Sequence, residues 1–312
     1  MVTLPTRQFQ QMVPLLREKG FYEHKELREI SWPEYNLAQV KEIKEILKFI
    51  KESVDMSYSI VSEGKVGRPL TDAKILAKAV LLAEYLQSTE RMSEGWADVL
   101  GPVVGIFEHL DDRVVGEAYG RVEVLHLLRQ VFDKSKTSDG MLSGDGTGLE
   151  TSRKQNYENN KKAGGYMTSI VDSREIVQAF DISGKQECRI MFKLIEEVEG
   201  ESLRLDAGFI CRELVKRIEE RGMIPYIFPK SNTKLNGNLA WKLMYLELYY
   251  DVWQWLKEYH QRSHCESFHS SFKRKNKPMR KLRPTCQLAQ VIARIIIHNQ
   301  RKQLYYKRLH LS

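Results

Sequence analysis

The chain has 312 residues, 42% of them hydrophobic, which is typical of a globular protein with about two domains. No apolar run reaches the roughly 18 residues of a membrane helix, and the first twenty residues lack the apolar stretch of a secretory signal. We therefore expect a cytoplasmic protein with no membrane partner. Four scattered cysteines without a CxxC pair predict reduced thiols, and they indicate neither a zinc knuckle nor a disulfide framework.

Positive charge is concentrated near the C-terminus. The net charge is +8, but the stretch from Lys257 to Arg308 holds 14 Lys and Arg against 2 Asp and Glu, a net charge of +12. The rest of the chain therefore has a net charge of −4. Such a local excess predicts one face that meets a polyanion.

Helical periodicity dominates the first 135 residues. Apolar residues between Pro33 and Met56 recur at steps of three and four and predict one buried stripe, formed by Leu37, Val40, Ile43, Leu47 and Ile50. Two glycines and a proline predict a loop at 62–69. A second helix follows, with a stripe at Ile75, Ala79, Leu82 and Leu86, and a third is predicted at 113–133. We expect residues 1–135 to form an all-α domain, although residues 1–33 predict no clear element.

The sequence pattern changes after Ser135. Strands are predicted at 141–145, 166–171, 175–182, 202–206 and 224–228, and helices at 190–198, 209–221 and 239–272. Asp-Ser-Arg at 172–174 separates two of the strands and predicts a hairpin. An antiparallel ribbon followed by strand–helix alternation predicts a mixed sheet with helices packed on it, an α+β/α/β domain over residues 136–312.

Three carboxylates stand out by their positions. Asp145 and Asp206 each end a predicted strand and precede small residues, which leave room for a ligand, whereas Glu266 lies on a predicted helix near the basic cluster. Each has an ordinary alternative, since Asp-Gly is a turn signal and Asp206 could cap the next helix. Together they suit two Mg²⁺ ions about 3.5–4 Å apart acting on a phosphodiester.

A four-residue pattern surrounds Glu266. Tyr259, Arg262, Glu266 and Lys273 are separated by 3, 4 and 7 positions, so on a continuous helix all four project from one face. This pattern resembles the Tyr-Arg-Glu-Lys signature of the DDE transposases of prokaryotic insertion sequences, and it occurs with Asp-Gly-Thr at 145–147 and Asp-Ala-Gly-Phe at 206–209. The resemblance covers roughly residues 138–302, and residues 67–86 more weakly resemble the N-terminal helical region of the same transposases.

The resemblance implies a ribonuclease-H-like catalytic fold with a metal triad of Asp145, Asp206 and Glu266 that uses Mg²⁺ or Mn²⁺. It implies a nucleoid-associated enzyme that binds DNA, both terminal inverted repeats and target, as a homodimer. The helical domain would serve end recognition or oligomerisation. Some relatives carry a β-rich insertion before the catalytic Glu, for which the 60 positions between Asp206 and Glu266 leave no room. The expected DNA contacts are Tyr259, Arg262, Lys273, Arg274, Lys275, Lys277, Arg280 and Lys281.

Several alternatives remain open. The chain could be a metal-dependent nuclease of the same fold without strand transfer, or a catalytically inactive DNA-binding derivative. The histidines near Glu266 have spacings that could suit a transition metal, but we predict structural roles for them: His260, His264 and His269. We expect the tryptophans of the long helix in the core: Trp241, Trp253 and Trp255. A polar loop after Asp145 supplies further candidate contacts to the DNA backbone: Arg153, Lys154, Lys161 and Lys162.

Overall fold

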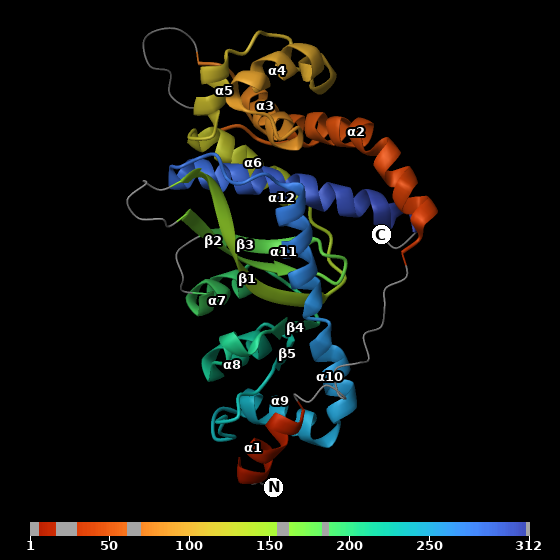
Figure 1. The fold of residues 1–312 in the computed structure, drawn as a ribbon, viewed down its shortest axis with the longest axis vertical. Coiled ribbons are helices and arrows are strands. Elements are labelled where there is room, and N and C mark those ends of the chain that lie inside the picture. Colours follow the sequence, from red (N-terminus) through yellow and green to blue (C-terminus); the bar gives the residue numbers. More distant parts are fainter. Residues whose placement is uncertain (1–5, 17–29, 61–69, 155–161, 183–186, 310–312) are drawn as a thin grey trace. The chain divides into compact units, whose positions relative to one another are not determined.

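The computed structural model describes residues 6–16, 30–60, 70–154, 162–182 and 187–309 (Figure 1). The predicted loop at 62–69 and the side chains of the candidate contacts at 153, 154, 161 and 162 lie outside the described part. The chain divides into two compact units. The first comprises residues 1–30, 138–148 and 165–271, and the second comprises 31–137, 149–164 and 272–312. Each unit is described by itself.

A five-stranded sheet forms the centre of the β-containing part. Its strands are β1 (Met141–Lys154), β2 (Lys162–Val171), β3 (Val177–Ile182), β4 (Ser202–Leu205) and β5 (Ile224–Ile227), in the order β3-β2-β1-β4-β5. The pair β2–β3 is antiparallel, with Met167 opposite Ile182. The pairs β1–β4 and β4–β5 are parallel, with Ser202 opposite both Met141 and Ile224. The predicted mixed sheet is thus confirmed.

The turn between β2 and β3 explains the hairpin. The Asp172 side chain is fully buried and accepts hydrogen bonds from the backbone N–H groups of Arg174 (3.0 Å) and Ile176 (2.8 Å). Glu175 adopts a positive φ of 65°, which closes the turn. The hairpin predicted from Asp-Ser-Arg is therefore confirmed, with Asp172 as the residue that holds it.

Helices pack around this sheet in the first unit. They are α1 (Thr6–Leu15), α7 (Glu187–Glu196), the single-turn 3-10 helix η2 (Ala207–Phe209), α8 (Arg212–Glu220), α9 (Leu239–Tyr250), α10 (Val252–His260) and α11 (Ser263–Lys275). Helix α1, in the region without a predicted element, adds Phe9 and Val13 to the same apolar core as Leu203 and Leu205 of β4.

The single long helix predicted at 239–272 is wrong, because the chain forms three helices there. Asp251 ends α9, and its side chain accepts a hydrogen bond from the N–H of Gln254 (3.1 Å), which caps α10. A turn at Gln261 and Arg262 then separates α10 from α11. Tyr259 and Glu266 consequently belong to different helices, and the four signature residues do not share one helical face.

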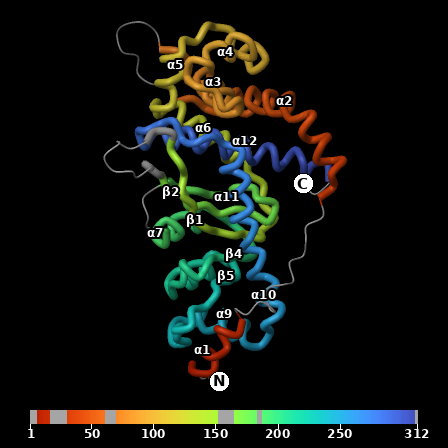
Figure 2. The backbone as a smooth tube through the Cα atoms, viewed as in Figure 1, coloured from red at the N-terminus to blue at the C-terminus, as the bar shows by residue number. Residues whose placement is uncertain are grey.

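The second unit is built on helices. They are α2 (Trp32–Asp55), α3 (Ala73–Tyr85), α4 (Glu90–Val104), α5 (Asp112–Ala118), α6 (Val122–Lys134) and α12 (Pro284–Arg308). Helix α12 packs against α2, α3 and α6 (Figure 2). The helix predicted at 113–133 is two helices, with a break around Gly120. No helix in the described ranges has the length and apolar character needed to cross a membrane.

The α2 stripe is buried only at its C-terminal end. Leu47 and Ile50 lie in the core, as predicted, whereas Leu37, Val40 and Ile43 are exposed by 42%, 80% and 60%. The predicted boundary between residues 135 and 136 stays a prediction. Residues 284–308, which lie beyond that boundary in the sequence, pack with helices from residues 31–137.

Candidate active site

Asp145 lies within β1, between two glycines. The strand continues to Lys154, so Asp145 does not end it as predicted. A Cβ at Gly144 would lie 2.7 Å from Leu205 Cδ2, and a Cβ at Gly146 would lie 2.6 Å from the Tyr166 ring. Neither position tolerates a side chain without movement of its neighbours, which explains why glycines flank the carboxylate.

Asp206 lies directly after β4. Its side chain accepts a hydrogen bond from the Gly208 N–H (3.3 Å) and caps η2, so the ordinary capping role is present. The side chain is nevertheless 46% exposed, which leaves carboxylate oxygen accessible to a ligand. Capping and ligand binding are compatible, because a carboxylate has about four lone-pair positions.

Arg262 brings the carboxylates into one electrostatic cluster. Its Nη1 lies 2.7 Å from Glu266 Oε1 and 3.7 Å from Asp206 Oδ1. Burial lowers the pKa of this guanidinium, but the charges of Tyr259, Glu266, Asp206 and Asp145 outweigh burial and raise it. Residues from the end of β4 and from α11 therefore lie beside one cation that also feels the charge of Asp145 on β1, although 61 and 60 positions separate the three carboxylates in the sequence.

The Asp145 carboxyl has a raised pKa. Burial raises the pKa of this carboxyl from 3.8 to about 6. The hydrogen bond from the Gly146 N–H (2.8 Å) and the charge of Arg262 oppose this rise, whereas the negative charges of Asp206 and Glu266 add to it. A partly buried carboxylate near two like charges is the kind of group that a bound cation stabilises.

The donor set fits a hard divalent cation. Carboxylate oxygens are the ligands that Mg²⁺ prefers, and the ion keeps several waters, so a few carboxylates suffice. Among the described residues, however, no three His, Cys, Asp or Glu side chains are already placed around one common metal position. Arg262 lies between two of the carboxylates, so their side chains would have to reorient to share an ion.

The aromatic signature residue is part of the core. Tyr259 is 6% exposed and stacks on Trp255, with ring centroids 5.5 Å apart and an interplanar angle of 16°. The Arg262 guanidinium lies 5.8 Å from the centre of the Tyr259 ring. Trp255 and Trp241 are buried as predicted, but the core position predicted for Trp253 is wrong, since it is 59% exposed.

The histidines near Glu266 have protein partners. His269 is buried, and its Nε2 lies 2.8 Å from Ser169 Oγ of β2. His264 Nε2 lies 3.0 Å from Gln261 Oε1. These contacts support the structural roles predicted for His264 and His269.

Sequence reasoning missed two polar residues beneath the site. Arg204 of β4 is 1% exposed and donates hydrogen bonds from Nε to the Glu258 carbonyl (2.8 Å) and from Nη2 to Glu258 Oε2 (2.5 Å). Ser143 of β1 is fully buried and donates to the Gln261 carbonyl (3.2 Å). The signal for Arg204 was present, because a lone arginine in a short apolar strand ending on a carboxylate requires a buried partner.

The basic run after Glu266 separates into two groups in the second unit. Lys273, Arg274, Lys275 and Lys277 are exposed. Arg280 instead pairs with Glu84 (2.5 Å), a fully buried carboxylate that also pairs with Arg294 (2.7 Å). Lys281 is 8% exposed and pairs with Glu90 (2.5 Å). The structure thus gives Arg280 and Lys281 internal partners, and their predicted DNA contact stays a prediction.

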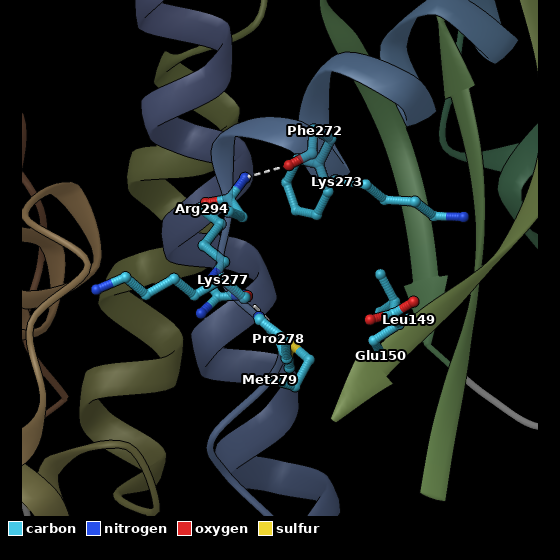
Figure 3. A pocket seen from close by; sticks show the side chains of 9 residues that line it. Leu149, Glu150, Phe272, Lys273, Lys277, Pro278, Met279 and Arg294 are labelled. Carbon is cyan, nitrogen blue, oxygen red and sulfur yellow. Dashed lines mark hydrogen bonds between the residues drawn. The ribbon is translucent and has the colours of Figure 1, made fainter. Parts of the chain in front are cut away.

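A pocket of about 170 Å³ lies within the second unit. Figure 3 shows Glu150 and Lys273 on one side of it and Arg294 and Pro278 on the other. Arg294 is paired with Glu84, and Lys277 Nζ donates to the Gln87 carbonyl (3.3 Å). The pocket lining thus carries the positive charges of Lys273, Lys277 and Arg294 and the negative charge of Glu150, and of these cations Arg294 already has a buried carboxylate partner.

Comparison with known proteins identifies the family. Residues 138–299, more than half of the chain, match the family described as "Transposase DDE domain". The chain therefore belongs to the DDE transposase family. The match includes Asp145, Asp206 and Glu266, while membership of the subgroup with the Tyr-Arg-Glu-Lys signature stays a prediction.

Two further comparisons add little. A search of curated proteins found no match. One similar solved structure is the cryo-EM structure of the piggyBac transposase synaptic complex with hairpin DNA, which is 13% identical over 88% of this chain and 78% of that chain. Its TM-score is 0.37.

Proposed function

We propose that this transposase cleaves DNA at the ends of its element and joins the freed 3′-hydroxyl to target DNA. The observation that carries the proposal is the convergence of Asp145, Asp206 and Glu266 around Arg262 in a chain of the DDE family. Bound Mg²⁺ or Mn²⁺ would activate the attacking oxygen and stabilise the leaving oxygen of the phosphodiester. The three carboxylates would hold these ions.

The proposed catalytic domain is ribonuclease-H-like. The sheet order β3-β2-β1-β4-β5, with an antiparallel β2–β3 pair and parallel β1, β4 and β5, supports this assignment. Asp145 on β1 and Asp206 directly after the adjacent parallel strand β4 are neighbours, since Gly144 pairs with Leu205. Neighbouring strands lie about 4.8 Å apart, which is compatible with two carboxylates serving one pair of ions.

Arg262 has a defined role in this proposal. In the structure its guanidinium pairs with Glu266, and it is 23% exposed. A phosphate group beside the carboxylates would offer Arg262 a bidentate partner that is negatively charged, like the Glu266 carboxylate with which it now pairs. Arg262 would then hold the DNA backbone while the carboxylates hold cations, and the cluster would stay close to charge balance. The exposed cations Lys273, Arg274, Lys275 and Lys277 would contact further phosphates.

The helical part of the chain is proposed to recognise the element ends or to form a homodimer on DNA. Its support is the exposed apolar surface of α2, where Leu37, Val40 and Ile43 follow one another at three-residue steps. Exposed apolar stripes of this kind are typical of interaction surfaces. Sedimentation of the chain with and without a duplex carrying the element end would measure the change in oligomeric state.

The test of catalysis uses Asp145→Ala and Glu266→Gln. Both variants should bind a duplex carrying the element end with nearly wild-type affinity but should cleave it at least about 100-fold more slowly in Mg²⁺. Full cleavage by either variant would refute the roles assigned to these carboxylates. Pre-cleaved ends test the second step: cleavage without strand transfer would identify a nuclease, and binding without cleavage by the wild type would identify an inactive derivative.

A further inference from the structure

Three strands of the first unit each direct one buried polar side chain to the α10–α11 segment. Arg204 of β4 bonds both the carbonyl and the carboxylate of Glu258, at 2.8 and 2.5 Å. Ser143 of β1 donates to the Gln261 carbonyl (3.2 Å), and Ser169 of β2 lies 2.8 Å from His269 Nε2. We call these three pairs, Arg204–Glu258, Ser143–Gln261 and Ser169–His269, the sheet anchors.

Along the α10–α11 segment, residues that contact the strands directly precede candidate site residues. Glu258 precedes Tyr259, and Gln261 precedes Arg262. Cys265, whose thiol lies 3.8 Å from the Ser169 carbonyl, precedes Glu266. One residue on a helix corresponds to a rotation of about 100° and a rise of about 1.5 Å. In a helix, Glu266 therefore projects beside the face that the strands hold.

The strands show a matching pattern. Ser143 lies two residues before Asp145 on β1, and Arg204 lies two residues before Asp206. Side chains two apart on an extended strand point to the same face of the sheet. Each strand that supplies a candidate metal ligand therefore also supplies an anchor on the same face, next to that ligand.

We propose that the sheet anchors are positioning residues, which set the register of α10–α11 over the sheet and thereby fix Arg262 and Glu266 relative to Asp145 and Asp206. This inference rests on the proposed function. Apolar contacts between a helix and a sheet are non-directional and allow small shifts. Hydrogen bonds are directional, and a buried polar group left without one is costly, so three anchors together select one register.

The experiment uses the full chain with Glu258→Gln and Ser143→Ala. Arg204 is kept because its side chain is 1% exposed, whereas the Glu258 side chain is 27% exposed and glutamine retains an oxygen that can accept the Arg204 Nη2 hydrogen bond. The matched control is Glu196→Gln, which removes the carboxylate of an exposed pair with Arg217 in the same unit. For each protein, calorimetry gives the Mn²⁺ affinity, and cleavage of a duplex carrying the element end gives kcat and KM. The unfolding midpoint shows that the variants are folded at the assay temperature.

The anchor variants should bind Mn²⁺ about 10-fold more weakly and should lower kcat about 10- to 100-fold with little change in KM, as expected for groups that orient metal ligands. Glu196→Gln should change none of these values. Folded anchor variants with wild-type Mn²⁺ affinity and kcat would overturn the inference. Asp145→Asn is measured in parallel. Normal cleavage by this variant would refute the proposed function itself. Loss of cleavage by Asp145→Asn, with normal cleavage by the anchor variants, would refute only the role of the anchors.

Discussion

Replacing Asp145 by asparagine should make the metal-free protein more stable at neutral pH. The substitution keeps the size of the side chain and an oxygen that can accept the Gly146 N–H bond. It removes a negative charge that lies partly buried near Asp206 and Glu266, where burial raises the pKa of the Asp145 carboxyl to about 6. A partly buried negative charge that catalysis requires is expected to reduce the free energy of unfolding.

The magnitude follows from the pKa of Asp145. A rise from 3.8 to about 6 corresponds to about 3 kcal/mol of unfolding free energy. Because the side chain is partly exposed, screening by solvent reduces the expected gain to about 1–3 kcal/mol. The pKa of Asp145 is higher in the folded state than in the unfolded state, so ionisation of this carboxyl lowers the free energy of unfolding. The loss is complete above about pH 6. As the pH falls from 6 to 4, the folded wild type takes up the proton first, so its stability relative to the variant recovers.

The assay is urea unfolding of both proteins in EDTA at pH 8, 6 and 4. The free energy of unfolding of Asp145→Asn should exceed that of the wild type at pH 8, and the difference between the two proteins should shrink to near zero at pH 4. Asp133→Asn, at a side chain that is 66% exposed, serves as the control and should change stability by less than about 0.5 kcal/mol. A difference that does not depend on pH, or a less stable variant at pH 8, would refute the reasoning.

Three further predictions test other parts of the structure, two of them with a matched control variant. Gly144→Ala places a methyl group 2.7 Å from its nearest neighbour and should cost about 1–3 kcal/mol in urea unfolding, whereas Gly148→Ala, with nothing within 4 Å, should cost much less. Glu84→Gln removes a buried carboxylate whose pKa is lowered, since the charges of two arginines outweigh the opposing effect of burial. It should cost about 3–5 kcal/mol at pH 7, with the deficit shrinking as the pH falls below 4.5 and acid protonates the wild-type carboxylate. Lys273→Ala should reduce the slope of log DNA affinity against log salt by about 1, while Lys281→Ala should leave that slope unchanged and lower the unfolding midpoint.

The positions of the strands along the chain were predictable because turn residues and β-rich runs are local signals. The hairpin at 172–174 and the strands at 202–206 and 224–228 were found in this way, whereas their order within the sheet was not predicted. The sequence analysis missed a break between two helices that depends on a single side chain. Asp251 ends one apolar helix and caps the next without interrupting the periodicity around it, so a pattern of period 3.6 reads through the break.

The metal triad of Asp145, Asp206 and Glu266 stays a prediction from motif and strand position, and the partners of these carboxylates could not be predicted from the sequence. Periodicity cannot show that Arg262 lies between Glu266 and Asp206, because that geometry depends on the turn between α10 and α11. In the same way, the basic run at 273–283 looked uniform in sequence. Only tertiary structure shows that Arg280 pairs with a carboxylate from α3, nearly 200 positions earlier.

The packing of α12 against α2, α3 and α6 has a consequence for biosynthesis. During translation, residues 31–137 leave the ribosome long before residues 284–308, which cover them in the finished protein. The early helices therefore keep apolar surface exposed until residues 284–308 have also been made. Premature termination would leave that surface uncovered for chaperones and proteases, so truncated products should be removed and full-length chains should accumulate.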